Sequence, residues 1–233
     1  MAKHHIENGL VFREYGDGLR LIGFSDKEDK RTRLSIPEFV FLSHSRSIEK
    51  RQVTEIAKNA FENNTRLQII ELPHSVRVID SDAFYNCPNL QVITSITGEW
   101  KDNSINIMKR AFACCTQLRI VDLHRPIYWL CEESFAFCPS LNKFTCPILD
   151  VAKNAFTPCR LESLTFYPKC RIHTDSIENS GVKELIFQGE IEYTPQKTMR
   201  WIKKAPIKIC CSITSSLQDL IYEGVCVETY KSF

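Results

Sequence analysis

Apolar residues recur along this chain in one repeated arrangement, in which an Ala-Phe pair precedes a leucine and two further apolar positions. In the first copy, Ala60-Phe61 is followed by Leu67, Ile70 and Leu72. Later copies begin with Ala83-Phe84, Ala111-Phe112, Ser134-Phe135 and Ala155-Phe156. Self-similarity at a period of about 20 to 50 residues indicates a stacked repeat architecture. The chain is therefore expected to form one elongated array.

A short strand is expected after each leucine that aligns the copies. These anchor positions are Leu67, Leu90, Leu118, Leu141, Leu161, Val182 and Leu217. Apolar residues tend to recur three and five positions later, as Ile70 and Leu72 do after Leu67. A spacing of two places both side chains on one face of a strand. Stacked in parallel, such strands predict a repeat solenoid of about six to seven coils.

A second rhythm links each strand to the next Ala-Phe pair. It places apolar residues at Val76 and Ile79 in one copy and at Ile127 and Leu130 in a later one. We expect turns and short helical segments on this side of the solenoid, opposite the strands. The small residue before each Phe allows close approach of the next coil, and the Phe fills the space between coils. Because each coil covers its neighbour, stacking itself creates the core.

Both ends of the chain depart from the repeat, as solenoid caps do. Leu10–Arg13 and Leu19–Ile22 flank Gly16-Asp17-Gly18, which predicts an N-terminal β-hairpin with a glycine-containing turn. A last edge strand is expected at Cys226–Tyr230. The predicted division is a capping hairpin and connector over 1–30, a leucine-rich repeat solenoid over 31–227 and a C-terminal tail over 228–233.

The residues of one full copy resemble a known family. Ala83–Ile93 reads Ala-Phe-Tyr-Asn-Cys-Pro-Asn-Leu-Gln-Val-Ile, and Leu72–Ile79 reads Leu-Pro-His-Ser-Val-Arg-Val-Ile. This pattern resembles the BspA-like leucine-rich repeat family over about residues 30 to 227. It departs from the family at Cys146, and over 170–216, where Ile177 stands nearest to the lost Ala-Phe step. The resemblance implies a leucine-rich repeat fold. It also implies an alternative function, that of a surface-associated adhesin that binds host matrix or cells.

Charge and hydropathy narrow the classes of partner. Thirty basic and 28 acidic residues leave a net charge of +2, whereas a nucleic-acid-binding face is normally strongly basic. The first eight residues lack the apolar run of a secretory signal, and no stretch of 18 apolar residues is present. We therefore predict a cytoplasmic protein without membrane insertion and without nucleic acid as a partner. A cell-surface location reached by a non-classical route is the alternative.

The chain has eleven cysteines, and four of them follow the repeat. Cys87, Cys115, Cys138 and Cys159 each stand three residues after the Phe of their copy. No Cys-x-x-Cys spacing of the kind that binds zinc occurs. A phosphate-binding glycine loop, Gly-x-Ser-x-Gly and His-Glu-x-x-His are also missing. We predict buried structural thiols and no catalytic, cofactor-binding or metal-binding residue, with a thiol-dependent enzyme or redox protein as an alternative.

Outward strand positions are the first candidates for binding. Two positions after the anchors, Ile69, Val92 and Ile120 form an apolar stripe edged by Glu71 and Asp122. An exposed apolar patch with a polar rim is typical of a protein interface. The alternative is that β-branched residues stand there for their strand propensity alone.

Aromatic residues outside the repeat pattern are the second candidates. Trp100 lies in a polar insertion, and Tyr128-Trp129 fill positions that are Arg77-Val78 in an earlier copy. Aromatic residues dominate interface hot spots. The alternatives are that Trp100 folds back over the base of its own loop and that Tyr128-Trp129 pack against the inserted neighbouring loop. The leading prediction is a non-enzymatic protein–protein interaction module that acts on a protein partner through its exposed strand face.

Overall fold

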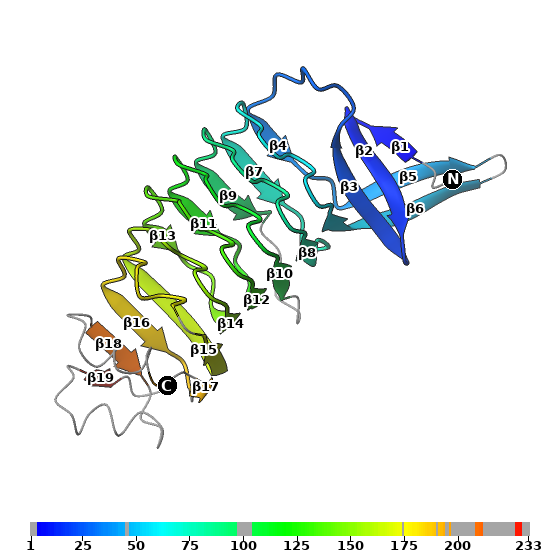
Figure 1. Ribbon diagram of the computed structural model, residues 1–233. Helices are drawn as coiled ribbons and strands as arrows, with labels where there is room; N and C mark the ends of the chain where they lie inside the picture. The colour runs from blue at the N-terminus through cyan, green and yellow to red at the C-terminus, as the bar shows by residue number, and fades with distance from the viewer. Residues whose placement is uncertain are drawn as a thin grey trace.

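The computed structural model describes residues 4–44, 47–96, 104–173, 175–189, 191–193, 196, 208–211 and 227–229. Successive coils stack into an elongated solenoid, with twisted antiparallel strands at its N-terminal end (Figure 1). Most coils contribute a strand to each of two ladders, so parallel strands run along two sides of the stack. The predicted leucine-rich repeat solenoid is confirmed.

The first ladder contains the strands that follow the leucine anchors. It is a five-stranded parallel sheet in the order β13-β11-β9-β7-β4. Its members are β4 (Arg33–Ser35), β7 (Ile69–Leu72), β9 (Val92–Ser95), β11 (Ile120–Asp122) and β13 (Lys143–Phe144). Ile70, Ile93 and Val121 are aligned in adjacent strands and fully buried. The predicted spacing of inward residues is therefore correct.

A second ladder takes the place of the short helical segments expected on the other side. It includes β6 (Ser47–Ile56), β8 (Val78–Ile79), β10 (Ile105–Ile107), β12 (Ile127–Leu130) and β14 (Ile148–Val151). In β10, β12 and β14 the first and last residues are buried apolar side chains. These strands have only two to four residues from β8 to β14. Such short runs become strands because the neighbouring coils supply their hydrogen bonds, which no local pattern reveals.

The two ladders meet in the C-terminal coils. The ten-residue β15 (Ser163–Ile172) pairs with β16 (Glu184–Phe187) at its start and with β17 (Ile191–Tyr193) at its end. Beyond β16 come β18 (Lys208–Cys211) and β19 (Val227–Thr229), which is the terminal strand of the path. The predicted edge strand is thus present. Leu217, the anchor of the last predicted copy, lies outside the described residues.

The N-terminal hairpin is present as predicted and continues the second ladder. β1 (His4–Glu7), β2 (Leu10–Tyr15) and β3 (Gly18–Phe24) are antiparallel neighbours, and β3 pairs in parallel with β6. A guanidinium nitrogen of Arg20 lies 2.7 Å from a carboxylate oxygen of Glu55, across the junction. Burial raises the pKa of Glu55, and Arg20 opposes that shift. The cap therefore completes the end of the stack, while the domain boundaries stay a prediction.

A second hairpin at this end was not predicted. β5 (Phe39–His44) pairs with the first part of β6, and the pair projects from the cap (Figure 1). Val40 and Leu42 are buried, whereas Phe41 is 58 % and Ile48 74 % exposed. The alternation of inward Val40 and Leu42 is the sequence signal for this strand, and it lies outside the Ala-Phe repeat.

A column of phenylalanine rings runs through the core. The ring centroids of Phe61, Phe84, Phe112 and Phe135 are separated by 5.1, 5.2 and 5.2 Å in succession, with nearly parallel planes. Phe156 continues the column at 5.9 Å. Each ring contacts the ring of the next coil, as predicted from the Ala-Phe repeat. Aromatic pairs contribute about 0.5–1.5 kcal/mol beyond the burial of their area.

Main-chain hydrogen bonds also join the coils at the turns around each Phe. The amide of Phe84 donates to the carbonyl of Ala111 at 2.8 Å, and that of Asn86 to the carbonyl of Ala113 at 2.8 Å. The turns require left-handed residues at two positions per coil, such as Asp82 and Asn86, with φ of 58° and 55°. Asp and Asn tolerate this conformation better than other side chains.

Candidate interaction surfaces

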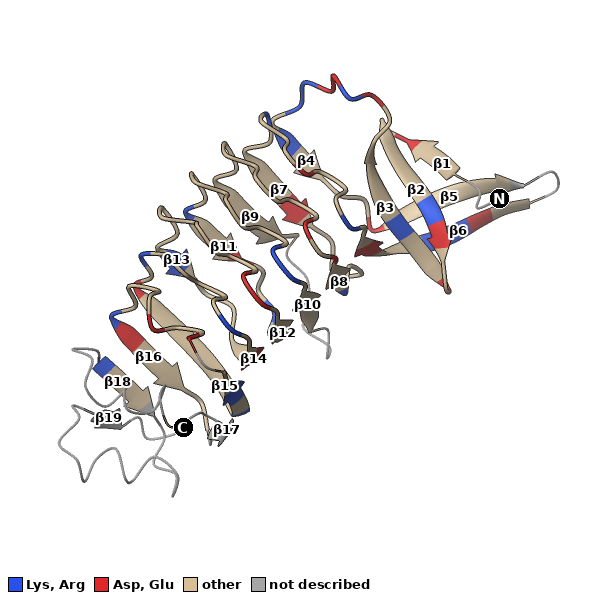
Figure 2. Cartoon of the chain, in the orientation of Figure 1, with Lys and Arg blue, Asp and Glu red and all other residues tan. Residues whose placement is uncertain are grey.

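The apolar stripe predicted from the sequence is a continuous row on the first ladder. Adjacent strands align Arg33 with Ile69, Ile69 with Val92, Val92 with Ile120, and Ile120 with Lys143. The three apolar side chains are half-buried, so the stripe exposes less apolar area than three fully exposed side chains would. Figure 2 shows charged residues on β4 and β13, at the two ends of this ladder, and none on β9 between them. We call these five residues the strand-face row.

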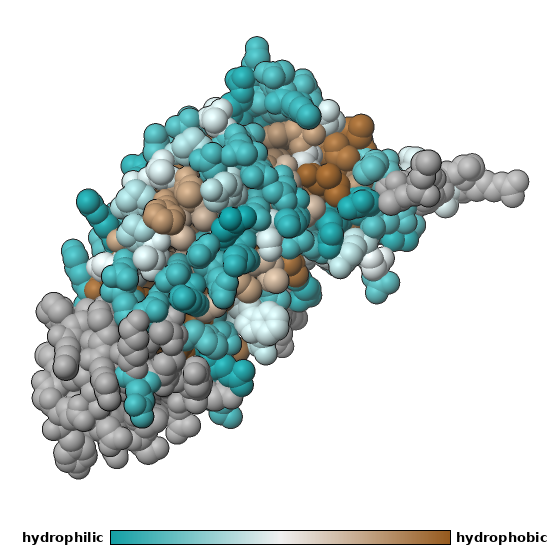
Figure 3. All heavy atoms as spheres, in the orientation of Figure 1, coloured by the Kyte–Doolittle hydropathy of each residue, from teal (hydrophilic) through white to brown (hydrophobic). Residues whose placement is uncertain are grey.

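Two carboxylates border the row, and both have partners within the chain. Adjacent strands align Ser35, Glu71, Thr94 and Asp122. The Arg33 guanidinium donates to Glu71 and holds the pKa of that carboxyl below its ordinary value. An oxygen of Asp122 lies 2.9 Å from Nδ1 of His124. The predicted acidic edge is therefore present, with its charges already engaged. Figure 3 shows hydrophobic patches bordered by hydrophilic residues along this part of the stack.

Tyr128 and Trp129 lie on the second ladder, away from the strand-face row. In β12, Ile127 and Leu130 are buried, while Tyr128 and Trp129 are 48 % and 49 % exposed. Their ring centroids are 6.0 Å apart. The structure thus brings the aromatic pair to the surface without joining it to Ile69, Val92 and Ile120. Trp100, the third aromatic candidate, lies outside the described residues.

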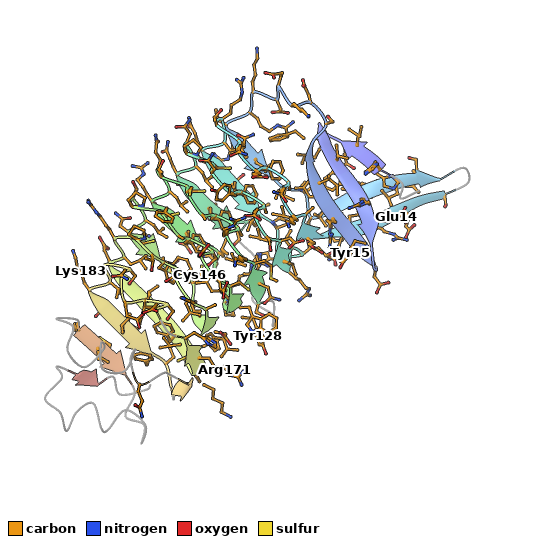
Figure 4. The ribbon with its side chains drawn as sticks, viewed as in Figure 1. Glu14, Tyr15, Tyr128, Cys146, Arg171 and Lys183 are labelled. Carbon is orange, nitrogen blue, oxygen red and sulfur yellow. The ribbon has the colours of Figure 1, made fainter. Side chains whose placement is uncertain are left out.

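A hollow of about 310 Å³ lies beside the aromatic pair. Its lining residues are Tyr128, Trp129, Leu149, Asp150, Pro168, Lys169 and Arg171. They come from β12, β14 and β15, in three successive strands of the second ladder. Figure 4 shows Tyr128 and Arg171 at the same edge of the solenoid. Sequence reasoning found the two aromatic residues and missed the rest, because this ladder was not predicted as strands.

The four repeat cysteines are buried and hydrogen-bonded to the phenylalanine column. Each thiol contacts the carbonyl oxygen of the Phe one coil earlier, with Sγ–O distances of 3.2 Å for Cys87 and Cys138, 3.3 Å for Cys115 and 3.4 Å for Cys159. Burial raises the pKa of Cys115 and Cys138, and raises that of Cys159 to about 12. Since the thiolate is the reactive form, these environments oppose nucleophilic and redox chemistry. The prediction of buried structural thiols is confirmed for these four.

Among the described residues, no group of three or more His, Cys, Asp and Glu side chains is arranged to hold a metal ion. The same residues include no helix with the length and hydropathy needed to cross a bilayer.

The repeat matches a family model over most of the chain. The BspA type leucine rich repeat region, in six copies, matches residues 35–161 and 105–224. The chain belongs to this leucine-rich repeat family. Proteins built from such repeats are generally interaction modules rather than enzymes. No curated protein matches the chain significantly.

The chain is similar to several solved structures. The leucine rich repeat protein of T. pallidum is 19 % identical, with a TM-score of 0.52, and the match covers 97 % of this chain and 98 % of that one. A leucine-rich repeat protein from Bacteroides capillosus is 22 % identical, with a TM-score of 0.43 over 53 % of this chain and 82 % of that one. A leucine rich cell surface protein from Faecalibacterium prausnitzii is 14 % identical, with a TM-score of 0.45 over 100 % and 96 %.

Proposed function

We propose that this protein is a non-enzymatic interaction module that binds a protein partner through the strand-face row. The observation that supports this most directly is the alignment of Ile69, Val92 and Ile120 in adjacent strands. Together they form one apolar stripe, which ends in Arg33 and Lys143. Burial of apolar area drives most protein association, and charged residues at the border contribute specificity.

The ladder itself suits this role. Its parallel strands are held by the stacking of coils, so the outward side chains are presented on a rigid surface. Binding to such a surface costs little free energy, because few side chains and loops of the repeat protein have to become ordered. The pairing of Glu71 with Arg33 also leaves few unpaired charges to be buried by the partner.

A capture experiment with three forms of the protein tests the proposal. Wild type, Ile120→Lys and Ile48→Lys are used as baits at equal concentration, and captured proteins are quantified by mass spectrometry. Ile48 is 74 % exposed on the β5–β6 hairpin, so it controls for the added charge. We expect one or more proteins to be captured by wild type and Ile48→Lys and lost with Ile120→Lys. The Tm of Ile120→Lys should lie within about 4 °C of wild type.

Equal capture by all three baits would contradict binding through the strand-face row.

The adhesin role and the cytoplasmic location both stay predictions. Surface labelling of intact cells that produce the protein would decide between them, because a cytoplasmic protein is not labelled until the cells are lysed.

A further inference from the structure

The hollow beside Tyr128 and Trp129 is formed by a row of outward side chains on the second ladder. Adjacent strands align Trp129 with Asp150 and Asp150 with Arg171. In a parallel sheet such neighbours share one face, so the indole, the carboxylate and the guanidinium lie side by side. This site is separate from the strand-face row and does not rest on it.

A bulge in β15 supplies one wall of the hollow. Ile148 pairs with Phe166 and Asp150 with Arg171, so the four residues 167–170 of β15 oppose Leu149 alone. Pro168 has no amide hydrogen to leave unpaired, and Lys169 takes a left-handed φ of 60°. A Cβ placed on Gly189 would lie only 2.8 Å from Cβ of Pro168, so the next coil packs tightly behind the bulge. Bulges often redirect side chains at functional sites.

The lining combines apolar surface with two basic side chains and one acidic side chain. Tyr128, Trp129, Leu149 and Pro168 supply the apolar part. The exposed Lys169 and Arg171 outnumber one carboxylate, Asp150, which lies 3.1 Å from Nε2 of His173. An anionic ligand is therefore favoured over a cationic one.

We propose that the hollow binds an acidic segment of a partner protein. An aromatic or large apolar side chain of that segment is seated against Tyr128 and Trp129, and a neighbouring carboxylate faces Lys169 and Arg171. Trp, Tyr and Arg are the residues most enriched at the energetic centres of protein interfaces, and all three line this hollow. Arg also suits a carboxylate because its planar fork can donate two parallel hydrogen bonds.

Titration with defined peptides tests the proposal on the full chain. Three heptapeptides share one Gly/Ser frame and carry Glu-Phe-Glu, Gln-Phe-Gln or Lys-Phe-Lys at the centre. The protein is labelled with 5-fluorotryptophan, and the fluorine resonance of Trp129 is assigned by its loss in Trp129→Phe. We expect a saturable shift with the acidic peptide, half-complete at a concentration roughly tenfold lower than with the neutral peptide. The basic peptide should give no saturable shift.

Variants separate the roles of charge and of aromatic surface. Lys169→Gln combined with Arg171→Gln should remove the preference for the acidic peptide, and Tyr128→Ala should weaken binding of all peptides about tenfold or more. Tyr167→Ala is the matched control, because Tyr167 is 41 % exposed on the same bulge and does not line the hollow. It should bind like wild type, and near-native Tm values show that each variant is folded.

Three results would overturn the proposal. One is a Trp129 resonance that no peptide shifts, and another is equal binding of the acidic and basic peptides. The third is a saturable shift with glucuronate but with none of the peptides, which would assign the hollow to an acidic sugar.

Discussion

The guanidinium of Arg125 donates through Nη1 to the carbonyl oxygen of Val76, 2.8 Å away and two coils earlier in the stack. The same nitrogen lies 3.1 Å from the carbonyl oxygen of His74. Arg125 is only 1 % exposed, and burial lowers its pKa to about 10. Within the described residues, Nε and Nη2 of this side chain have no hydrogen-bond partner. A single buried side chain therefore ties two distant corners of the solenoid together.

Arg125→Ala should destabilise the protein by about 2–4 kcal/mol, because it leaves a cavity and removes the donor to one buried and one partly buried carbonyl. Arg125→Met keeps most of the volume and removes the buried charge, so it should cost clearly less. Urea unfolding of both variants measures the difference. Arg119→Ala, at an exposed arginine on the same repeat, should stay within about 0.5 kcal/mol of wild type. Equal free energies of unfolding for Arg125→Ala and wild type would contradict a tethering role.

The phenylalanine column predicts that the stability lost in a Phe→Ala variant depends on how deeply the ring is buried. Phe84 is fully buried between Phe61 and Phe112, whereas Phe137 is 60 % exposed in the turn after Phe135. Phe84→Ala should lower the free energy of unfolding by about 3–5 kcal/mol, and Phe137→Ala should have only a small effect. Thermal and urea unfolding of the two variants check this. Similar losses for both would mean that the column is not the core of the stack.

The first ladder could be predicted from the sequence, whereas the hollow and the burial of Arg125 could not. Ile70, Ile93 and Val121 are spaced by the repeat itself, so the first ladder could be predicted from the chain alone. The hollow could not, because its residues meet only when three coils are stacked in register. Its wall depends on the bulge at Pro168 and Lys169, which no spacing rule indicates. Nothing in the sequence marks Arg125 as buried, since arginine is ordinarily a surface residue.

Backbone conformation predicts a stabilising change at Phe137. Its φ is +57°, a value at which Asn86 and Asn63 stand in equivalent turns, with φ of 55° and 60°. A non-glycine residue in this region costs about 1–2 kcal/mol, and Asn reduces that cost because its side chain bonds locally. Phe137→Asn should therefore raise the free energy of unfolding by up to about 1 kcal/mol, measured by urea unfolding. Phe137→Val, a β-branched residue, should lower it, and the opposite order would show that φ does not limit this turn.

Buried thiols predict a loss of stability in alkaline solution. Burial raises the pKa of Cys146 and Cys170 to about 12, from an ordinary value near 9.0. Between these values the folded protein keeps protons that the unfolded chain releases. The contribution to stability is thus complete below about pH 9 and is lost as the pH rises toward 12. Each such thiol should lower the free energy of unfolding by about 1 kcal/mol between pH 8 and pH 10.

Cys170→Ala isolates one of these contributions. The variant is expected to be less stable than wild type at pH 8, because it leaves a small cavity, but to lose about 1 kcal/mol less than wild type on going to pH 10. Val151→Ala is the matched control, since it also truncates a fully buried side chain of the second ladder but removes no titrating group. Its pH dependence should follow wild type. Urea unfolding at both pH values measures these losses. If wild type and Cys170→Ala lose the same free energy of unfolding between pH 8 and pH 10, the Cys170 thiol does not contribute to the pH dependence.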